Sequence, residues 1–306
     1  MLRAVTKLLR VANPDWTEVE RYIRERQFRF EYELPIFLRE LIETPLLQIA
    51  DRTKRLGIAQ CIMYEAWEQP DSRERERLST IATLVSSECA DAFSELASLS
   101  EDQAARLKFS ELAVAAGERA LGGKPQEARW GHLECRPYLR AKAGLAASLW
   151  DSGRHADAIA EYRDILRLNP GDNQGIRCVL LSRLGQLARF DEMDELVSHY
   201  PHDALADTAF TRALLAYRRK TADADALLGA ALARNRFVPD YLSGRKRVPK
   251  HLSGRIAMGS PDEAKAYAAE FASIWRQVEG ALDWLASFRA QRKTQSAIAE
   301  GPPWRH

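Results

Sequence analysis

The feature that most constrains the fold is a two-helix unit that recurs along the chain. It is clearest in LRAKAGLAASLWDSGRHADAIAEYRDILRLNP, the 32 residues from Leu139 to Pro170. Ala146 and Ala158 are small at the positions where two antiparallel helices would cross, and Gly153 falls in the turn between them. Tyr162 would fill the gap toward the next unit, and the closing proline prevents the second helix from continuing. This pattern predicts a helix–turn–helix that buries its apolar side chains by stacking on its neighbours.

The same layout returns twice, 35 residues later in ARFDEMDELVSHYP and 33 residues further on in ADADALLGAALARNRFVP. These copies place Met193 and then Ala226 at the position of Ala158. A looser helix pair, SECADAFSELASL with SEDQAARLKFSELAVAAGERALGG, precedes them, and Ser100 or the acids beside it could cap its second helix. Periods in this range indicate repeats of the tetratricopeptide type.

We therefore predict an all-α protein, an α-solenoid of stacked antiparallel helix pairs in a right-handed superhelix with helical caps at both ends. The array is expected to form one elongated domain rather than two globular ones. The predicted boundaries are an N-terminal helical extension (1–57), a tetratricopeptide-like repeat array (58–243), a basic connecting loop (244–260), C-terminal capping helices (261–290) and a flexible tail (291–306).

Composition narrows the functional classes. Lys plus Arg (45) nearly balances Asp plus Glu (43), so no global charge draws the chain to nucleic acid or to an anionic membrane. The four cysteines include no C-x-x-C pair, which argues against a zinc ribbon or a disulfide-rich secreted fold and favours the cytoplasm. No window approaches the roughly 20 apolar residues of a membrane span. We expect no cofactor and no metal, and we interpret HYPHD (residues 199–203) as a turn because Pro201 separates its two histidines.

The stretch NPGDNQG, Asn169 to Gly175, could be a phosphate loop, a calcium loop or a turn. A Walker loop needs four residues between its glycines followed by Lys-Ser/Thr, whereas this stretch has three residues and is followed by Ile176 and Arg177. A calcium loop led by Asp172 would need acceptors at positions that hold Gln and Ile. The turn explains the glycines, and Asp172 or Asn173 would cap the next helix. Gln174 and Arg177 exceed what a turn requires and could contact a partner, Arg136 or Arg140.

Two further motifs carry a family resemblance. Arg136-Pro137-Tyr138 with Arg140, and the run from Asp172 to Arg177, are its most specific parts within a match over about residues 58–285. The chain resembles the suppressor-of-tumorigenicity-7-like family, in particular its soluble bacterial members with tetratricopeptide repeats. The resemblance implies an all-helical scaffold with no assigned reaction. The segment before Arg136 is shorter than in that family, and the membrane segments of eukaryotic members are absent. The family-motif candidates are Arg136, Tyr138, Asp172, Asn173, Gln174 and Arg177.

In stacks of tetratricopeptide repeats, the first helix of each pair lines the concave groove. Counting from Leu139, Gln174 and Asp207 as first positions, we predict that the groove carries Arg140, Trp150, Cys178, Ser182, Thr208, Thr211 and Arg218. Such a groove is mildly basic and apolar, and suits an extended or helical segment of a protein partner with some acidic character. The main prediction is therefore a non-catalytic interaction scaffold.

Two alternatives remain open at this level. GRKRVPKHLSGR is a basic patch whose cations are Arg245, Lys246, Arg247, Lys250 and Arg255, and it could bind an acidic partner or make the chain a nucleic-acid-associated regulator. With no interleaved aromatic residues to stack on bases, nucleic acid is the weaker prediction. A ligand sensor or enzyme would instead need a closed polar pocket. The sequence contains no Gly-x-Ser-x-Gly or His-Glu-x-x-His motif and names no nucleophile.

Overall fold

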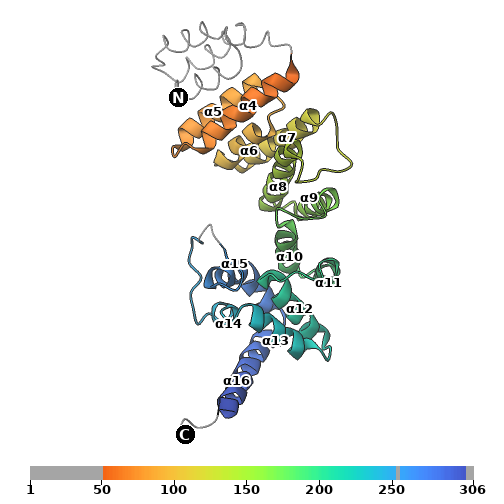
Figure 1. Cartoon of the computed structure of the whole chain (residues 1–306), viewed down its shortest axis with the longest axis vertical. Helices are drawn as coiled ribbons and strands as arrows, with labels where there is room; N and C mark the ends of the chain where they lie inside the picture. Colours follow the sequence, from red (N-terminus) through yellow and green to blue (C-terminus); the bar gives the residue numbers. More distant parts are fainter. Residues whose placement is uncertain (1–50, 253–255, 301–306) are drawn as a thin grey trace. The chain divides into compact units, whose positions relative to one another are not determined.

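A computed structural model describes residues 51–252 and 256–300, with side chains as far as residue 291. Every regular element in these residues is a helix, and they contain no strand, so the all-α prediction is confirmed. Packing divides the chain into two compact units that meet in sequence at Ile176 and Arg177, rather than the single continuous domain predicted. We call them the N-terminal unit and the C-terminal unit, and describe each by itself (Figure 1).

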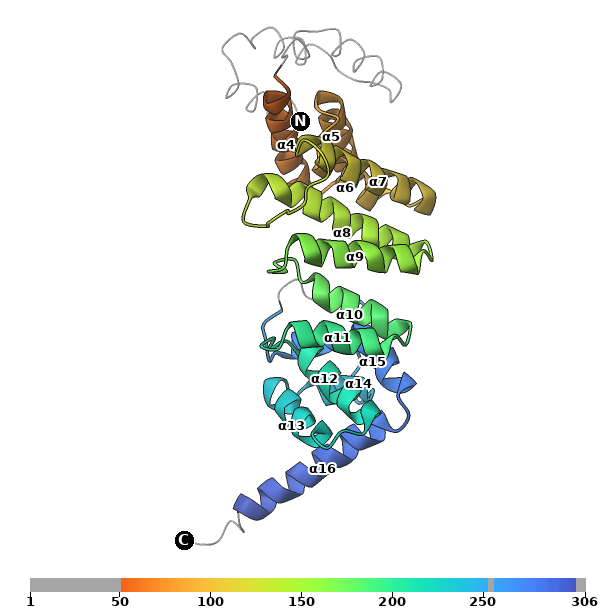
Figure 2. The ribbon, with the colours of Figure 1, turned by 90° about the vertical axis from the view of Figure 1, so that its right-hand side faces the viewer.

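The N-terminal unit consists of three antiparallel helix pairs in its described part. Its elements are α4 (Arg52–Trp67), α5 (Ser72–Val85), α6 (Ala90–Leu99), α7 (Gln103–Ala120), the short 3₁₀ helix η2 (Leu133–Cys135), α8 (Arg136–Asp151) and α9 (His155–Leu168). Within each pair the second helix packs on the first, and successive pairs join where α5 packs on α6 and α7 packs on α8 (Figure 2). The first helices α4, α6 and α8 also contact one another in sequence order.

Aspartates fix where three of these helices begin. Asp51 accepts hydrogen bonds from the backbone N–H groups of Thr53 and Lys54, and Asp71 accepts one from Arg73. At the start of α7, Asp102 accepts from Ala105 at 2.7 Å, as expected for an acid next to Ser100. Each aspartate satisfies a backbone donor that has no partner inside its helix.

The crossing residues of the clearest repeat behave as predicted. Ala146 and Ala158 are fully buried between α8 and α9, and Tyr162 is 3% exposed. Helices α7 and α8 also approach closely, because a Cβ added at Gly117 of α7 would lie 3.0 Å from the Cα of Tyr138 in α8. Small residues therefore set the short distance between neighbouring helices.

A buried cation joins α8 to α9. The Nζ atom of Lys142 lies 2.5 Å from a carboxylate oxygen of Glu161 and 2.9 Å from one of Asp164, and the lysine side chain is 4% exposed. Burial alone would lower the pKa of Lys142, but the hydrogen bonds to both carboxylates outweigh it and raise the pKa. Lys142 therefore stays charged and paired inside the helix pair.

The described part of the C-terminal unit is also built of helices only. Its helices are α10 (Ile176–Gln186, which begins at the boundary), α11 (Phe190–His199), α12 (Ala206–Arg219), α13 (Ala224–Arg234), α14 (Val238–Leu242), α15 (Pro261–Gln277) and α16 (Ala281–Glu300). The predicted cap does begin at Pro261, where Ser260 accepts a hydrogen bond from the N–H of Glu263. The predicted flexible tail is wrong over residues 291–300, because α16 continues to Glu300. Residues 1–50 and 301–306 lie outside the described residues.

The turns within the pairs α8/α9, α10/α11 and α12/α13 use the left-handed backbone region. Gly153 has φ 76°, and the corresponding turns carry Ala188 with φ 54° and Lys220 with φ 56°. The last turn is longer, since α13 begins only at Ala224. For this reason the predicted place of Ala226 at the helix crossing is wrong: it is exposed, and Leu228 is buried instead.

The left-handed backbone at Ala188 predicts a stabilising substitution. Ala188→Gly removes the steric cost of a Cβ in that region and should raise the free energy of unfolding by about 0.5 kcal/mol, net of the greater chain entropy of glycine. Ala230→Gly, at an exposed position inside α13, is the matched control and should lower it by about 0.5–1 kcal/mol. Urea unfolding compares the two variants, and equal effects of the same sign would contradict the assignment.

Candidate functional site

In the C-terminal unit the predicted groove is filled by the chain's own helix α15. Three of the predicted groove residues are buried, with Ser182 at 1%, Thr208 at 3% and Thr211 at 0% exposure. The Ser182 hydroxyl donates to Glu270 of α15 at 2.9 Å, and Thr211 lies next to the hydroxyl of Tyr267. These side chains cannot contact a partner while α15 is in place, so the prediction that they line an open groove is wrong.

Apolar packing holds α15 against α10 and α12. A Cβ added at Gly185 of α10 would lie 2.5 Å from the Cδ1 atom of Ile274, which shows how closely the two helices approach. The rings of Phe210 and Tyr267 have centroids 5.5 Å apart, and Phe271 stacks on Tyr267 at 4.6 Å. The indole N–H of Trp275 donates to the Tyr267 hydroxyl at 2.8 Å. α15 is thus part of the core.

A buried carboxylate anchors the start of α15. Glu263 is 4% exposed and accepts hydrogen bonds from the N–H of Ala206 at 3.0 Å, the side-chain amide of Asn235 at 2.9 Å and the N–H of Gly259 at 2.6 Å. Three donors compensate the loss of water around this carboxylate. They also tie α15 to the beginning of α12.

A second acid near α15 is less well compensated. Burial raises the pKa of Asp207 from 3.8 to about 6, and the negative charges of Glu263, Asp203 and Glu270 add to the rise. Asp203 differs because it accepts hydrogen bonds from Arg177, Leu205 and Thr208, and its pKa is lowered although burial alone would raise it. The charged form of Asp207 therefore opposes the packing of α15.

The corresponding side of the N-terminal unit carries exposed aromatic side chains. Tyr64 is 57% exposed and Trp67 is 41% exposed, both on α4, and their ring centroids are 5.7 Å apart. The indole N–H of Trp67 donates to Glu95 of α6 at 3.2 Å, and the guanidinium of Arg140 from α8 lies 5.7 Å from the Trp67 ring centre. We call this cluster, together with Asp91, the α4–α6–α8 face.

Arg140, a predicted groove residue, is tied into this face by an ion pair. Its guanidinium donates twice to the carboxylate of Asp91, at 2.9 and 2.6 Å, and Gln60 donates to the same carboxylate at 2.8 Å. The Asp91 side chain is 1% exposed, whereas that of Arg140 is 36% exposed. Arg140 therefore neutralises a buried acid and holds the Trp67 ring, with only part of its surface available for contacts.

The remaining predicted groove residues do not extend this cluster. Trp150 is half-buried and stacks on His155 with centroids 4.2 Å apart. Cys178 is half-buried in α10. In the C-terminal unit Arg218 lies over the ring of Phe190 at 4.6 Å and 3.6 Å from Asp191.

The Arg-Pro-Tyr motif has a structural position. Arg136 donates from Nε to the carbonyl of Trp130 at 2.9 Å, and its guanidinium lies 5.3 Å from the Trp130 ring centre. Tyr138 is fully buried against Gly117, and its hydroxyl donates to Glu118 at 3.5 Å. Burial, followed by the negative charges of Glu118 and its neighbours, raises the pKa of Tyr138. Arg136 thus connects α8 to the loop before it, and Tyr138 connects α8 to α7.

The second motif is the turn that leads into α10. Asp172, with φ 43°, accepts a hydrogen bond from the N–H of Ile176 at 2.7 Å, so it caps the next helix as predicted. Asn173 is exposed beside it. The side-chain amide of Gln174 donates to the carbonyl of Leu139 at 3.3 Å, and no arginine among the described residues donates to its Oε1. Arg177 pairs with Asp203 at 2.7 Å and lies over the ring of Tyr200 at 5.3 Å. The hypothesis that Gln174 and Arg177 contact Arg136 or Arg140 is therefore not supported.

The basic patch stays exposed in the C-terminal unit. Arg245, Lys246, Arg247 and Lys250 are all exposed, and Lys246 lies 3.6 Å from Asp240. Lys246 also lies about 6 Å from the ring centres of Phe237 and Tyr241. The sequence did not predict this contact, because neither aromatic residue lies within the basic patch. Arg255 lies outside the described residues.

Sequence reasoning missed Tyr64 and Trp67. Both lie in YEAW, where a spacing of three residues puts two aromatic side chains on one side of a helix. The predicted groove begins with the helix that contains Leu139 and therefore does not include α4, which carries both residues. An aromatic pair at this spacing next to polar neighbours was the available signal.

In the described part of the chain, no helix is both long and apolar enough to cross a membrane. The same residues contain no group of three His, Cys, Asp or Glu side chains that could hold a metal ion.

Comparison with known proteins identifies no family. No family model matches the chain, and no curated protein matches it. The likeness to the suppressor-of-tumorigenicity-7-like family therefore remains a resemblance. Among solved structures, the chain is similar to YrrB, a TPR protein with an unusual peptide-binding site, with a TM-score of 0.40 and 14% sequence identity over 64% of this chain and 91% of that one.

The Arg140–Asp91 pair predicts a strong coupling in stability. Arg140→Met should lower the free energy of unfolding by about 2–4 kcal/mol, because it leaves the Asp91 carboxylate buried without its main partner. Adding Asp91→Asn should recover much of that loss, since the charge is then gone. Urea unfolding of both single variants and the double variant measures the coupling, and simple additivity would contradict the pairing.

The raised pKa of Asp207 predicts a pH dependence. Because the folded-state pKa (about 6) exceeds the ordinary value of 3.8, the contribution of Asp207 to stability is largest below pH 3.8 and is lost as the pH rises through about 6. Asp207→Asn should therefore be more stable than wild type by about 1–2 kcal/mol near pH 7.5, and by clearly less near pH 4.5. The control is Asp191→Asn, at a side chain that is 97% exposed. If the gain of Asp207→Asn is the same at both pH values in urea unfolding, the assignment is wrong.

Proposed function

We propose that this chain is a non-catalytic interaction scaffold that binds a segment of a protein partner on the α4–α6–α8 face of its N-terminal unit. The observation that carries the proposal is the exposed aromatic pair Tyr64 and Trp67, on a face whose counterpart in the C-terminal unit is covered by α15. Polar side chains of α6 and α8 contact the Trp67 ring.

The geometry of Trp67 suits a binding hot spot. Large aromatic side chains contribute strongly to interfaces because they bury much apolar area while losing little conformational entropy. The hydrogen bond to Glu95 and the contact with Arg140 limit the rotamers of Trp67 before any partner arrives. Such preorganisation reduces the entropy lost on binding.

Charge should contribute less to partner binding on this face than the sequence analysis predicts. Arg140 is neutralised by Asp91, and Glu95 lies 3.2 Å from Arg75 as well as accepting from Trp67. These offsets weaken the predicted preference for an acidic partner. We therefore propose that apolar or aromatic side chains of an extended or helical segment pack on Tyr64 and Trp67.

A peptide library displayed on phage and selected on the immobilised chain tests this proposal. Selected peptides should be rich in apolar residues, and their affinity should fall at least about tenfold in the variant Tyr64→Ser with Trp67→Ser. Leu187→Ser, which removes a 36% exposed apolar side chain from the C-terminal unit, is the matched control and should bind as wild type does.

Two results would overturn the proposal. One is a set of peptides that bind wild type and the double variant equally well. The other is a set rich in Asp and Glu whose binding falls steeply with salt, which would support recognition by charge instead. Circular dichroism confirms that each variant is folded. Arg140 is unsuitable for this test, because its replacement leaves Asp91 uncompensated.

A further inference from the structure

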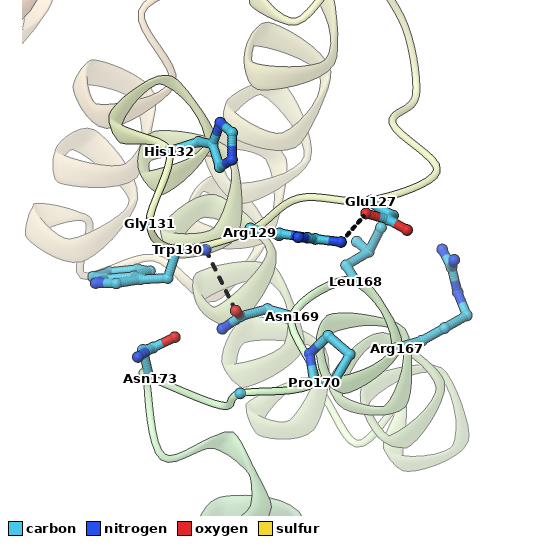
Figure 3. Close-up of a pocket in the computed structure, with 11 residues that line it drawn as sticks. Glu127, Arg129, Trp130, Gly131, His132, Arg167, Leu168, Asn169, Pro170 and Asn173 are labelled. Carbon is cyan, nitrogen blue, oxygen red and sulfur yellow. Dashed lines mark hydrogen bonds and ion pairs between the residues drawn. The ribbon is translucent and has the colours of Figure 1, made fainter.

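The N-terminal unit contains a cavity that is separate from the α4–α6–α8 face. Its volume is about 620 Å³, and its walls are the loop before α8, residues 127–132, and the turn after α9, residues 167–173 (Figure 3). The turn is the one that carries the NPGDNQG motif. A cavity of this size lies within the range of small-molecule sites, roughly 300–1,000 Å³.

The walls are held in place by hydrogen bonds between the loop and α9. The N–H of Ala128 donates to the carbonyl of Leu168 at 3.2 Å, and Arg167 donates to the carbonyl of Gln126 at 3.1 Å. On the other side of the loop, Arg136 donates to the carbonyl of Trp130. The backbone of both walls is therefore held in place without a ligand, which limits the ordering that binding requires.

A buried amide in the wall lacks a partner for its donor. Asn169 is 4% exposed, and its Oδ1 accepts from the N–H of Trp130 at 3.3 Å. That donor fixes which end of the amide is the oxygen, so Nδ2 must point away from the Trp130 backbone. Among the residues that the structure describes, none accepts a hydrogen bond from Nδ2. Burying a donor without an acceptor is costly, so this nitrogen calls for an acceptor from outside the chain.

Figure 3 shows where such an acceptor would lie. The Asn169 amide nitrogen is directed toward the space between the Trp130 ring and Asn173. The nitrogen itself is buried behind the cavity surface, and we take the exposed side chain of Asn173, which also lines the cavity, to be the group that a ligand displaces to reach it. The guanidinium of Arg136 lies 5.3 Å from the centre of the Trp130 ring and does not line the cavity, whereas Trp130 does. We therefore place a stacked ligand on the side of the indole away from Arg136.

The charges at the rim are compensated by neighbouring acids. Arg129 lies 3.1 Å from Glu127, and Arg167 lies 2.8 Å from Asp164, with both arginine side chains more than half exposed. An anion would have to compete with these carboxylates and with water, so the rim gives it little advantage. The features left for recognising a neutral ligand are the indole of Trp130, the unpaired donor of Asn169 and the exposed polar side chains of His132 and Asn173.

We infer that this cavity binds a small uncharged molecule with a planar ring, which stacks on Trp130, and a carbonyl oxygen, which accepts a hydrogen bond from Asn169. Carboxamides of aromatic rings and nucleobases share this chemistry. The site is independent of the partner-binding face and involves no reaction.

Three matched probes test the inference by ligand-observed NMR titration of the full chain. Benzamide has both features, cyclohexanecarboxamide lacks the planar ring, and benzoate replaces the neutral amide by an anion. Benzamide should bind at least about tenfold more tightly than either of the others. Trp130→Leu and Asn169→Asp should each weaken benzamide binding at least about tenfold, the first by removing the stacking surface and the second by removing the donor while keeping an oxygen for the Trp130 N–H.

The rim variant Arg129→Gln is the control, because Arg129 pairs with Glu127 and holds neither wall, and it should leave benzamide binding unchanged. Circular dichroism checks folding, and Trp130→Leu serves as the second test if Asn169→Asp does not fold. Preferred binding of benzoate, with loss in the rim variant, would show an anion site and overturn the inference. Absence of saturable benzamide binding to wild type would also overturn it, as would benzamide binding to the Trp130→Leu and Asn169→Asp variants that is as tight as binding to wild type.

Discussion

The close approach of neighbouring helices is the constraint on which the rest of the structure depends. Alanine or glycine at the crossing points, such as Ala146, Ala158 and Gly117, brings backbones near enough for side chains to reach across a pair. That short distance lets Lys142 of α8 pair with two carboxylates of α9. It also brings α4, α6 and α8 together, so that Arg140 can reach both Asp91 and Trp67.

The two units use the same kind of surface in different ways. In the C-terminal unit the first helices α10 and α12 bury their polar groove positions under α15, with Gly185 allowing the contact and Glu263 satisfying the backbone at its end. In the N-terminal unit the first helices present Tyr64 and Trp67 to solvent. The repeat pattern by itself predicts the same role for both surfaces, because it depends only on positions along the helices. It contains no information about a helix from elsewhere in the chain that packs over one of them.

Charged residues at predicted binding positions turn out to hold the fold together. Arg140 compensates a buried aspartate, Arg177 pairs with Asp203, and Arg136 holds the loop before α8. Among the buried side-chain atoms that lack a hydrogen-bond partner in the described residues is Nδ2 of Asn169, in a turn that the sequence explained by its glycines and its proline. Hydrogen-bond satisfaction of buried groups thus separates structural residues from candidates for recognition more sharply than residue type does.

The sequence by itself determined the helix pairs, their turns and the small residues at their crossings, since these depend on local backbone preferences and on the period of about 34 residues. It also placed Pro261 at the start of the C-terminal helices and Asp172 as a cap. The repeat alignment predicted the wrong buried residue in α13, where the turn is longer: Ala226 is exposed and Leu228 is buried. Only the tertiary structure decided that α15 fills one groove, that Tyr64 and Trp67 remain exposed, and that a loop closes over Asn169. Each of these depends on contacts between segments far apart in sequence, for which local periodicity carries no signal.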